Sequence, residues 1–325
     1  MVLGIVYVIV PVVVVLGIVR KYREYTWGKC TDFNSLEGKV VLVTGANSGI
    51  GKETVKGLAI RKARVIMACR NLSAAKAVIE DIRKNVATGE LIPMKLDLSS
   101  LRSVKSFAEE VLKDFPNIHV LINNAGVSVP VTESKKTEDG FEIHFGVNHL
   151  GHFLLTDILL EKLKKSSPSR VVVVSSTLHQ SGVIDFDNLN GEKGFTGKVR
   201  NPGYCNSKLA NAYFCQELAR RTADTGVEVF AVCPGFCYTG LFRYSKVKWY
   251  QKVLFLPIAF FFMRSAAQGS QTVLHCAVSD SVLGTSGQFY RDCKPYKSTH
   301  NFDPEVGVKL WEVSENLISK TLQTK

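Results

Sequence analysis

Apolar and amphipathic stretches alternate regularly along most of this chain of 325 residues. Short apolar runs predict strands at 39–44, 64–69, 91–96, 119–123, 170–175, 227–233 and 287–290. Stretches with helical spacing predict helices at 49–61, 73–86, 101–115, 140–163 and 203–221. The strand runs are continuous rather than alternating, which is typical of a parallel sheet covered on both faces. The pattern therefore predicts one α/β domain over residues 38–325, with a doubly wound, mostly parallel sheet.

The N-terminus departs from this alternation. Residues 2–19 carry no charge and would form a helix about 27 Å long, close to the roughly 30 Å of a bilayer core. Arg20, Lys21 and Arg23 follow directly, whereas a cleaved signal peptide normally carries its positive charges first. A buried core helix is the other alternative, but the run has no polar face. The sequence predicts an uncleaved membrane anchor at 1–20 and a linker at 21–37, with the folded domain on the cytosolic side.

Composition and charge narrow the function classes. Hydrophobic residues make up 46% of the chain and charged residues 22%, which argues against a disordered protein. Lysine and arginine total 41 against 29 acidic residues, for a net charge of +12. This excess fits nucleic acid, an anionic membrane surface or an anionic cofactor. Because the sequence has no basic stripe interleaved with aromatic residues, nucleic acid is not expected as a partner.

The residues that commonly bind metals have no metal-binding spacing. The eight cysteines form neither a C-x-x-C pair nor a zinc motif, and we expect them to be reduced and mostly buried. His144, His149 and His152 lie close together in the sequence but lack the H-E-x-x-H pattern. Structural or pocket-lining roles are therefore expected for these histidines, and no metal site is predicted.

A glycine-rich turn follows the first predicted strand. Glycines at such a turn let the backbone approach a pyrophosphate, and the free N–H groups of the next helix favour the anion. A lone glycine turn is weak support, but here it lies between a predicted strand and a predicted helix. The sequence predicts a dinucleotide site whose contacts include Gly45, Asn47, Ser48, Gly49, Ile50 and Gly51.

Arg70 ends the second predicted strand. An acidic residue there would bind the ribose 2′-hydroxyl of NAD, whereas an arginine can pair with a 2′-phosphate. Lys52 could add positive charge nearby. The alternative is that both are ordinary surface residues, but the position of Arg70 favours NADP(H).

Five motifs occur in a fixed order: TGANSGIG at 44–51, NNAG at 123–126, the serine pair at 175–176, YCNSK at 204–208 and Pro-Gly at 234–235. Together they resemble the short-chain dehydrogenase/reductase family over about residues 38–320. The longer strings ACRN, NHLGHFLLT and YCNSKLANAYF are similar to its retinol dehydrogenase branch, whose members are membrane-anchored and use NADP(H). The resemblance implies a Rossmann fold and hydride transfer between a nicotinamide and a carbonyl or alcohol carbon.

Four residues are candidates for catalysis. Tyr204 and Lys208 are four positions apart on a predicted helix and share a face. A nearby ammonium is expected to lower the pKa of the phenol, which would make Tyr204 an acid and base near neutral pH. The family resemblance implies that Lys208 also holds the nicotinamide ribose, that Ser176 rather than Ser175 binds the reacting oxygen, and that Asn148 supports a proton relay.

The same resemblance implies further cofactor contacts. Asp97 and Leu98, after the third strand, are expected at the adenine, although the Asp-Leu-Ser-Ser stretch could equally begin a helix. The NNAG motif is expected to line the cofactor edge, and the segment after the last long strand to fold over the nicotinamide. The residues assigned these two roles are Asn123 or Asn124, Ala125, Gly126, Pro234, Gly235 and Thr239.

The resemblance also implies a substrate class and a location. Retinol and retinal are the leading pair, with a steroid or a lipid aldehyde as the alternative within the family and a non-catalytic membrane scaffold as the alternative outside it. The apolar stretch at 253–263 is expected to wall the substrate site and to touch a membrane, or else to be an ordinary buried helix. An insertion at about 182–199 separates Ser176 from Tyr204 by 28 positions. Membrane lipid is an expected partner, the endoplasmic reticulum is the expected location, and a homo-oligomer remains open.

Overall fold

The order of the strands confirms the predicted doubly wound sheet. In this computed structural model, which describes residues 2–195, 199, 201–240, 256–257 and 259–324, eight strands form one sheet in the order β3-β2-β1-β4-β5-β6-β7-β8. All neighbours are parallel except β7 and β8. The strands are β1 (Val40–Thr44), β2 (Arg64–Cys69), β3 (Glu90–Lys95), β4 (Val120–Asn123), β5 (Ser169–Val174), β6 (Val227–Cys233), β7 (Phe289–Arg291) and β8 (Lys294–Pro295).

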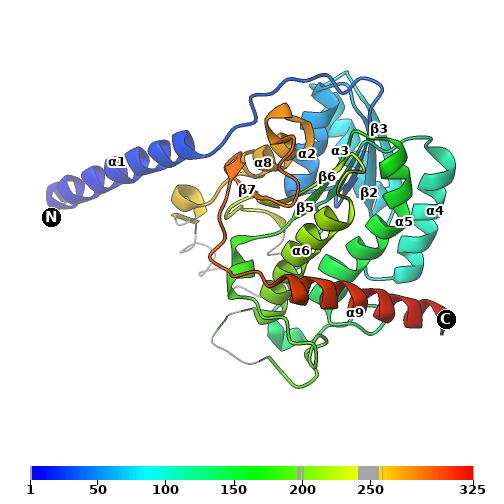
Figure 1. Ribbon diagram of the computed structural model, residues 1–325. Coiled ribbons are helices and arrows are strands. Elements are labelled where there is room, and N and C mark those ends of the chain that lie inside the picture. Colours follow the sequence, from blue (N-terminus) through cyan, green and yellow to red (C-terminus); the bar gives the residue numbers. More distant parts are fainter. Residues whose placement is uncertain (1, 196–198, 200, 241–255, 258, 325) are drawn as a thin grey trace.

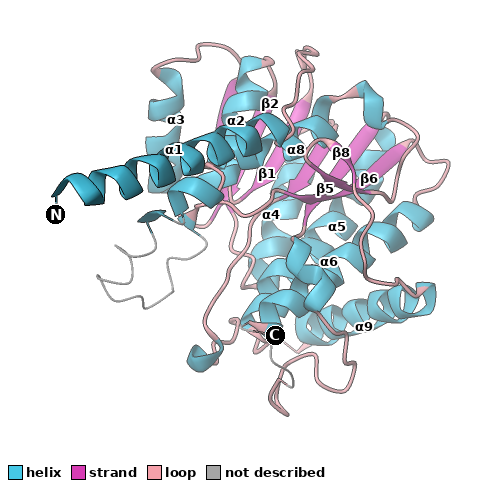
Figure 2. Ribbon diagram, turned by 90° about the vertical axis from the view of Figure 1, so that its left-hand side faces the viewer, coloured by secondary structure: helices cyan, strands magenta, loops and turns pink. Residues whose placement is uncertain are grey.

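Helices cover both faces of the sheet (Figures 1 and 2). On one face, the apolar core joins the sheet to α4 (Leu101–Asp114), α5 (Gly151–Lys165), α6 (Pro202–Arg221) and α9 (Pro304–Gln323). On the other, a second core joins it to α2 (Gly49–Ile60), α3 (Leu72–Arg83) and α8 (Ala266–Val278). The central strands are buried on both sides, which explains why their sequences are continuously apolar.

Two differences from the predicted elements matter for function. The single helix predicted at 140–163 is instead a π-helix, η2 (Phe145–Leu150), that continues into α5. A π-turn widens the helix locally and is frequent at functional sites. The helices α8 and α9 and the short strand β8 were not predicted from the sequence.

The N-terminal helix α1 runs over Val2–Thr26 and projects from the domain (Figure 1). It extends six residues beyond the predicted anchor, so part of the predicted linker at 21–37 is helical. Among the residues that the structure describes, no helix has both the length and the apolar character needed to cross a membrane. The predicted anchor at 1–20 is therefore not confirmed.

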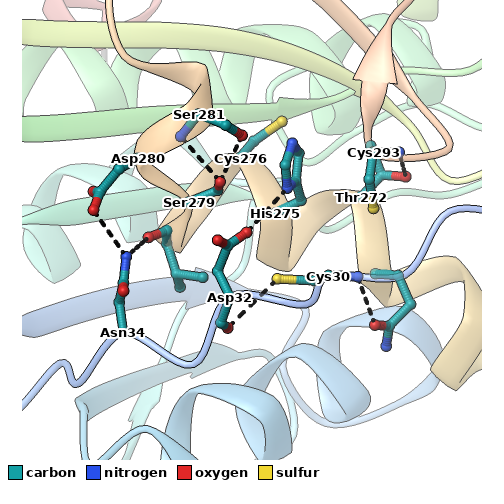
Figure 3. A network of polar contacts seen from close by, with 12 residues as sticks. Cys30, Asp32, Asn34, Thr272, His275, Cys276, Ser279, Asp280, Ser281 and Cys293 are labelled. Carbon is teal, nitrogen blue, oxygen red and sulfur yellow. Dashed lines mark hydrogen bonds and ion pairs between the residues drawn. The ribbon is translucent and has the colours of Figure 1, made fainter.

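The chain after α1 is bound along α8 (Figure 3). The Cys30 backbone N–H donates to Gln271 Oε1 at 3.2 Å, and Asn34 Nδ2 donates to the Val278 carbonyl at 3.1 Å. Cys30, Asp32 and His275 bring potential metal-ligand atoms within 4.8 Å of one another. However, the Arg61 guanidinium lies 3.7 Å from Cys30 Sγ and also donates to the Asp32 carbonyl. We therefore interpret the cluster as a tie between the linker and the domain.

Candidate active site

The candidate site lies at the carboxyl ends of β1, β4 and β5. Strand order reverses between β1 and β4, because the chain winds outwards from β1 to β3 and then returns. In doubly wound sheets the ligand binds in the crevice at this reversal. The residues predicted for the cofactor and for catalysis follow these strand ends.

The glycine turn between β1 and α2 is shaped for close approach. Gly45 has φ +65, and a Cβ there would lie 2.9 Å from Ala125 Cα. A Cβ on Gly51 would lie 2.2 Å from the Gly45 carbonyl oxygen. Ser48 occupies the N-cap of α2 but makes no capping hydrogen bond, unlike Asn71 and Ser100 at α3 and α4. This arrangement leaves first-turn N–H groups of α2 for an anion, so the turn fits a dinucleotide pyrophosphate.

Thr44 joins the glycine turn to the NNAG segment. Its Oγ1 accepts hydrogen bonds from the backbone N–H groups of Asn124 and Ala125, at 3.0 and 2.9 Å. Oγ1 also lies 2.9 Å from His152 Nε2, while His152 Nδ1 lies 3.0 Å from the Asn148 carbonyl. Because that carbonyl can only accept, Nδ1 carries the proton and Nε2 accepts from Thr44. Burial lowers the pKa of His152 to about 4, so the ring stays neutral and the chain of bonds stays intact.

The two asparagines of NNAG have different roles. Asn124 Nδ2 donates to the Thr44 carbonyl at 2.8 Å, which places its side chain beside the glycine turn. Asn123 is buried, and its Nδ2 donates to Thr156 Oγ1 at 2.8 Å. Asn123 therefore secures β4 to α5, and Asn124 is the asparagine whose side chain lies beside the glycine turn. The sequence pattern could not separate the two, because neighbouring residues in a strand point to opposite faces.

The residues predicted for the adenosine end lie after β2 and β3. Arg70 follows β2 and its side chain is exposed, so the guanidinium is free of the core and available to a phosphate. Asp97 Oδ1 accepts from the backbone N–H and the hydroxyl of Ser99, at 3.0 and 2.7 Å. Ser100, rather than Asp97, caps α4. Leu98 is buried against the start of α5 at Gly151.

Asn148 lies in the π-helix η2 and is held on both sides of its amide. Its Oδ1 accepts from the Val127 backbone N–H at 2.8 Å, and its Nδ2 donates to Ser207 Oγ at 3.0 Å. Ser207 belongs to α6, the helix that carries Tyr204 and Lys208. Gly126 lies between the side chains of Asn148 and Lys208, since a Cβ there would be 3.5 Å from Asn148 Oδ1 and 3.6 Å from Lys208 Nζ. The π-turn thus brings Asn148 next to Ser207 and Lys208 of α6.

The two serines after β5 are also distinct. Ser175 is 2% exposed, and its hydroxyl donates to the Lys208 carbonyl at 2.8 Å. Ser176 is partly exposed and caps the short helix η3 (Thr177–Ser181). A hydrogen bond from Ser176 acts on the Tyr204 phenol. Ser176 is therefore the serine that faces the site.

Tyr204 and Lys208 lie one helical turn apart on α6, and Lys208 Nζ is 5.7 Å from the centre of the Tyr204 ring. Burial raises the pKa of Tyr204 above its usual value, while the Ser176 hydrogen bond opposes this shift. Burial also lowers the pKa of Lys208 to about 8. In the protein alone the pKa of the phenol is raised rather than lowered, because loss of hydration on burial is the largest influence on it. The lowering of this pKa by Lys208 stays a prediction. Lys208 Nζ donates instead to the Val174 carbonyl at 2.9 Å.

The segment after β6 closes the site from the other side. Gly235 has φ +84, which favours glycine, and Pro234 precedes it. The Thr239 side chain lies over the glycine turn, since a Cβ on Gly49 would be 3.3 Å from Thr239 Cβ. Of the apolar stretch at 253–263, residues 253–255 and 258 lie outside the described residues. Leu256, Phe260 and Phe262 within it are exposed.

Sequence reasoning missed several residues that support the site. His179 Nδ1 lies 2.6 Å from the Ser176 carbonyl, and its Nε2 lies 2.6 Å from Ser298 Oγ. The His179 ring therefore holds the backbone of Ser176 in position. Thr44 and His152 link the turn to Asn148, as described above. Only Thr44 carried a sequence signal, as the first residue of the glycine motif. The two histidines act through tertiary contacts that no short motif encodes.

The fold and these groups define an oxidoreductase of the Rossmann type. The chain belongs to the short chain dehydrogenase family, whose model matches residues 39–248. It is 46% identical to retinol dehydrogenase 11 of Homo sapiens, over 90% of this chain and 89% of that protein. It is 44% identical to retinol dehydrogenase 12 of Homo sapiens, over 92% of each chain. The family assignment from the five motifs is thereby confirmed.

Solved structures agree with the fold. An uncharacterised protein from Mycobacterium paratuberculosis is 33% identical, with a TM-score of 0.70 over 90% of this chain and 98% of that chain. A protein from Beutenbergia cavernae that is described as an NAD(P)-dependent gluconate 5-dehydrogenase, with NADP bound at low occupancy, is 23% identical, with a TM-score of 0.64 over 79% and 96% of the two chains. The second likeness shows the fold alone.

Proposed function

We propose that this protein is an NADP(H)-dependent oxidoreductase that interconverts retinol and retinal. One observation carries the catalytic part of the proposal: the side chains of Asn148, Ser176, Tyr204 and Lys208 converge beside the glycine turn. These residues come from three elements and are joined by the contacts of Ser207, Ser175 and Gly126 described above. The arrangement matches what carbonyl reduction requires, namely a proton donor and an oxygen-binding group next to a hydride source.

Each residue has a defined task in this proposal. Bound NADP(H) supplies the hydride. Tyr204 gives its phenolic proton to the carbonyl oxygen during reduction and takes it back during oxidation. Ser176 donates a hydrogen bond to the same oxygen. Lys208 would hold the nicotinamide ribose, and its ammonium would favour the phenolate when Tyr204 loses its proton. Asn148 would support the relay through which Tyr204 regains its proton after reduction.

The preference for NADP(H) is supported by Arg70. The guanidinium lies at the end of β2, where a dinucleotide ribose is expected, and its exposure leaves it free to bind a 2′-phosphate. Asp97 and Leu98 would then contact the adenine, and Pro234, Gly235 and Thr239 the nicotinamide. The glycine turn from Gly45 to Gly51 would hold the pyrophosphate, with Asn47, Ser48 and Ile50 at its rim.

The substrate proposal is supported by the relatives and by surface chemistry. Retinol dehydrogenases of three kinds are 43–46% identical to this chain. Leu256, Phe260 and Phe262 present apolar side chains to solvent on the segment that follows the nicotinamide cover. Exposed apolar side chains of this kind suit contact with a long hydrocarbon substrate and with lipid.

We propose further that residues 1–20 anchor the protein in a membrane, with the catalytic domain on the cytosolic side of the endoplasmic reticulum. The support is the charge-free run at 2–19 and the basic residues Arg20, Lys21 and Arg23 that follow it. A fluorescent fusion and alkaline carbonate extraction of membranes test this. Release of the intact full-length protein by carbonate would contradict the anchor.

The function is tested by product analysis with the purified full-length protein. All-trans-retinal, a steroid ketone and a medium-chain aldehyde are each offered with NADPH and, separately, with NADH. We expect retinol to form, and to form faster with NADPH. Turnover of the steroid or the aldehyde alone would replace the retinoid assignment, and a preference for NADH would overturn the role of Arg70. Arg70→Ser is expected to narrow the preference for NADPH about tenfold, because one charged contact to a phosphate is lost.

A further inference from the structure

Arg264 is buried beneath the segment that closes the nicotinamide end of the site. Its side chain is 5% exposed, and Nη1 donates to the Pro234 carbonyl at 3.3 Å. Its backbone pairs with the same segment, donating to the Phe236 carbonyl at 2.8 Å and accepting from the Tyr238 N–H at 2.9 Å. One residue therefore binds the 234–238 segment through both its side chain and its main chain.

The fit between Arg264 and this segment is close. A Cβ added to Gly235 would lie 2.7 Å from the Arg264 Cζ and Nε atoms, so the guanidinium packs directly on the glycine backbone. The guanidinium forms an ion pair with Asp292, whose Oδ1 lies 2.5 Å from Arg264 Nη2. Asp292 itself lies in the turn between β7 and β8, with φ +56. The guanidinium thus joins the nicotinamide cover to the edge of the sheet.

Trp27 packs on the remaining face of this guanidinium. The indole is 7% exposed and its ring centre lies 4.9 Å from Arg264 Cζ. Arg20 lies 4.8 Å from the same ring and also donates to the Met263 carbonyl at 2.5 Å. Trp27 is the first residue after α1. The end of the N-terminal helix is therefore packed onto the residue that holds the cover.

The next contact along the chain fixes this position. A Cβ on Gly28 would lie 2.0 Å from the Asp292 carbonyl oxygen, so the two backbones are in direct contact. Only glycine fits there, which leaves Trp27 little freedom to leave the guanidinium. Cation–π contacts are strongest where the arginine is desolvated, so this contact can influence which position the buried Arg264 side chain adopts.

We propose that Arg264 is a positioning residue for the nicotinamide coenzyme, and that Trp27 holds Arg264 in place. The base of the N-terminal helix is then part of the coenzyme site, so detaching that helix weakens coenzyme binding. This inference rests on the proposed function, because it takes residues 234–239 as the nicotinamide cover. It assigns a role to two residues that lie outside the catalytic group and outside the glycine turn.

The test uses the full-length protein with three variants, Arg264→Gln, Trp27→Leu and the double variant. We measure the dissociation constant of NADPH by its fluorescence, and the KM for NADPH and kcat with the best carbonyl substrate. Arg264→Gln is expected to weaken NADPH binding on the order of tenfold, and Trp27→Leu about threefold. Because both changes remove one coupled arrangement, the double variant is expected to be no weaker than Arg264→Gln alone.

Two controls separate positioning from loss of structure. Phe33→Leu removes another linker aromatic, which is 79% exposed and lies 5.5 Å from the Arg61 guanidinium, and NADPH affinity should not change. Asp292→Asn removes the ion pairs to Arg264 and to Arg291 but keeps the backbone, since asparagine tolerates positive φ, and it should weaken NADPH binding less than Arg264→Gln does. Arg264→Lys should restore part of the affinity. A structural defect would instead lower kcat and the melting temperature while leaving the KM for NADPH unchanged.

The outcomes distinguish this inference from the proposed function. Unchanged NADPH affinity in folded Arg264→Gln, or strictly additive effects of the two substitutions, would overturn the inference while wild-type turnover stands. A wild-type protein that binds NADPH but reduces no carbonyl would overturn the proposed reaction, and the binding measurements would still test Arg264. Failure of the wild-type protein to bind any dinucleotide would overturn both.

Discussion

The two halves of the site are built in different ways. The coenzyme half, at the ends of β1 and β2, relies on backbone N–H groups, glycines and one exposed arginine. The catalytic half, at β5, η2 and α6, relies on buried side chains whose pKa values are shifted by loss of hydration. The first half works by leaving space and unpaired donors for a ligand, whereas the second works by fixing side chains before the substrate arrives. Substitutions in the coenzyme half should therefore change coenzyme binding, and substitutions in the catalytic half should change turnover.

The largest effect is expected from Tyr204→Phe in the catalytic half. Removing the only proposed proton donor should lower kcat on the order of a thousandfold. The affinity for NADPH should change little, because the ring and its packing remain. Steady-state kinetics and NADPH fluorescence titration measure the two quantities separately. Full activity in this variant would contradict the assignment of Tyr204.

A smaller but substantial effect is expected from Thr44→Val, where the two halves meet. Valine has the shape of threonine but leaves the Ala125 N–H and the His152 ring without their partner, and leaves the Asn124 N–H with only the Ile122 carbonyl. Each unsatisfied buried group costs about 1–3 kcal/mol, so the melting temperature should fall by several degrees and NADPH binding should weaken.

Thr44→Ser is the matched control, because it keeps the hydroxyl and should behave almost as the wild type. If the serine and valine variants melted at the same temperature and bound NADPH equally well, the hydrogen-bond network would not have the role given to it here.

In the coenzyme half, Gly45→Ala should weaken NADPH binding on the order of tenfold, since both the left-handed backbone and the approach of Ala125 oppose a Cβ. Gly38→Ala is a matched control, because Gly38 also has a positive φ, at +75, but a Cβ there meets nothing within 4 Å. Isothermal titration should show a loss only in the first variant. An equal loss of NADPH affinity in both variants would mean that backbone strain, rather than the close approach of Ala125 to Gly45, causes the effect.

The smallest effect concerns stability and pH. The pKa of Lys208 falls from 10.5 to about 8 on burial, so the unfolded chain binds more protons than the folded protein between these values. Stability should therefore rise as pH increases from about 8 to 10.5. Lys208→Met should remove this rise and, by about 1 kcal/mol, stabilise the fold at pH 7. Chemical denaturation at several pH values checks both effects, and a stability of Lys208→Met that still rises over this range would contradict them.

The same contrast explains how much could be predicted from the sequence. The strands β1 to β7, the helices α2 to α6 and the glycine turn follow from local pattern, since each depends on residues close together in the chain. The different contacts of Asn123 and Asn124 could not be predicted from the sequence, because they depend on which side of β4 packs against α5. The raised pKa of Tyr204 did not follow either, because burial is a property of the folded molecule. Arg264 and Trp27 are 237 positions apart, and no motif links them.

The central claim is that the two halves together transfer a hydride from NADPH to an apolar carbonyl under the control of Tyr204. It is tested most directly with NADPH deuterated at C4 of the nicotinamide, all-trans-retinal and mass analysis of the retinol formed. We predict one deuterium at the carbinol carbon with the wild-type protein and no labelled product above background with Tyr204→Phe. Wild-type protein that binds NADPH yet labels neither retinal nor any other carbonyl in the panel would contradict the account.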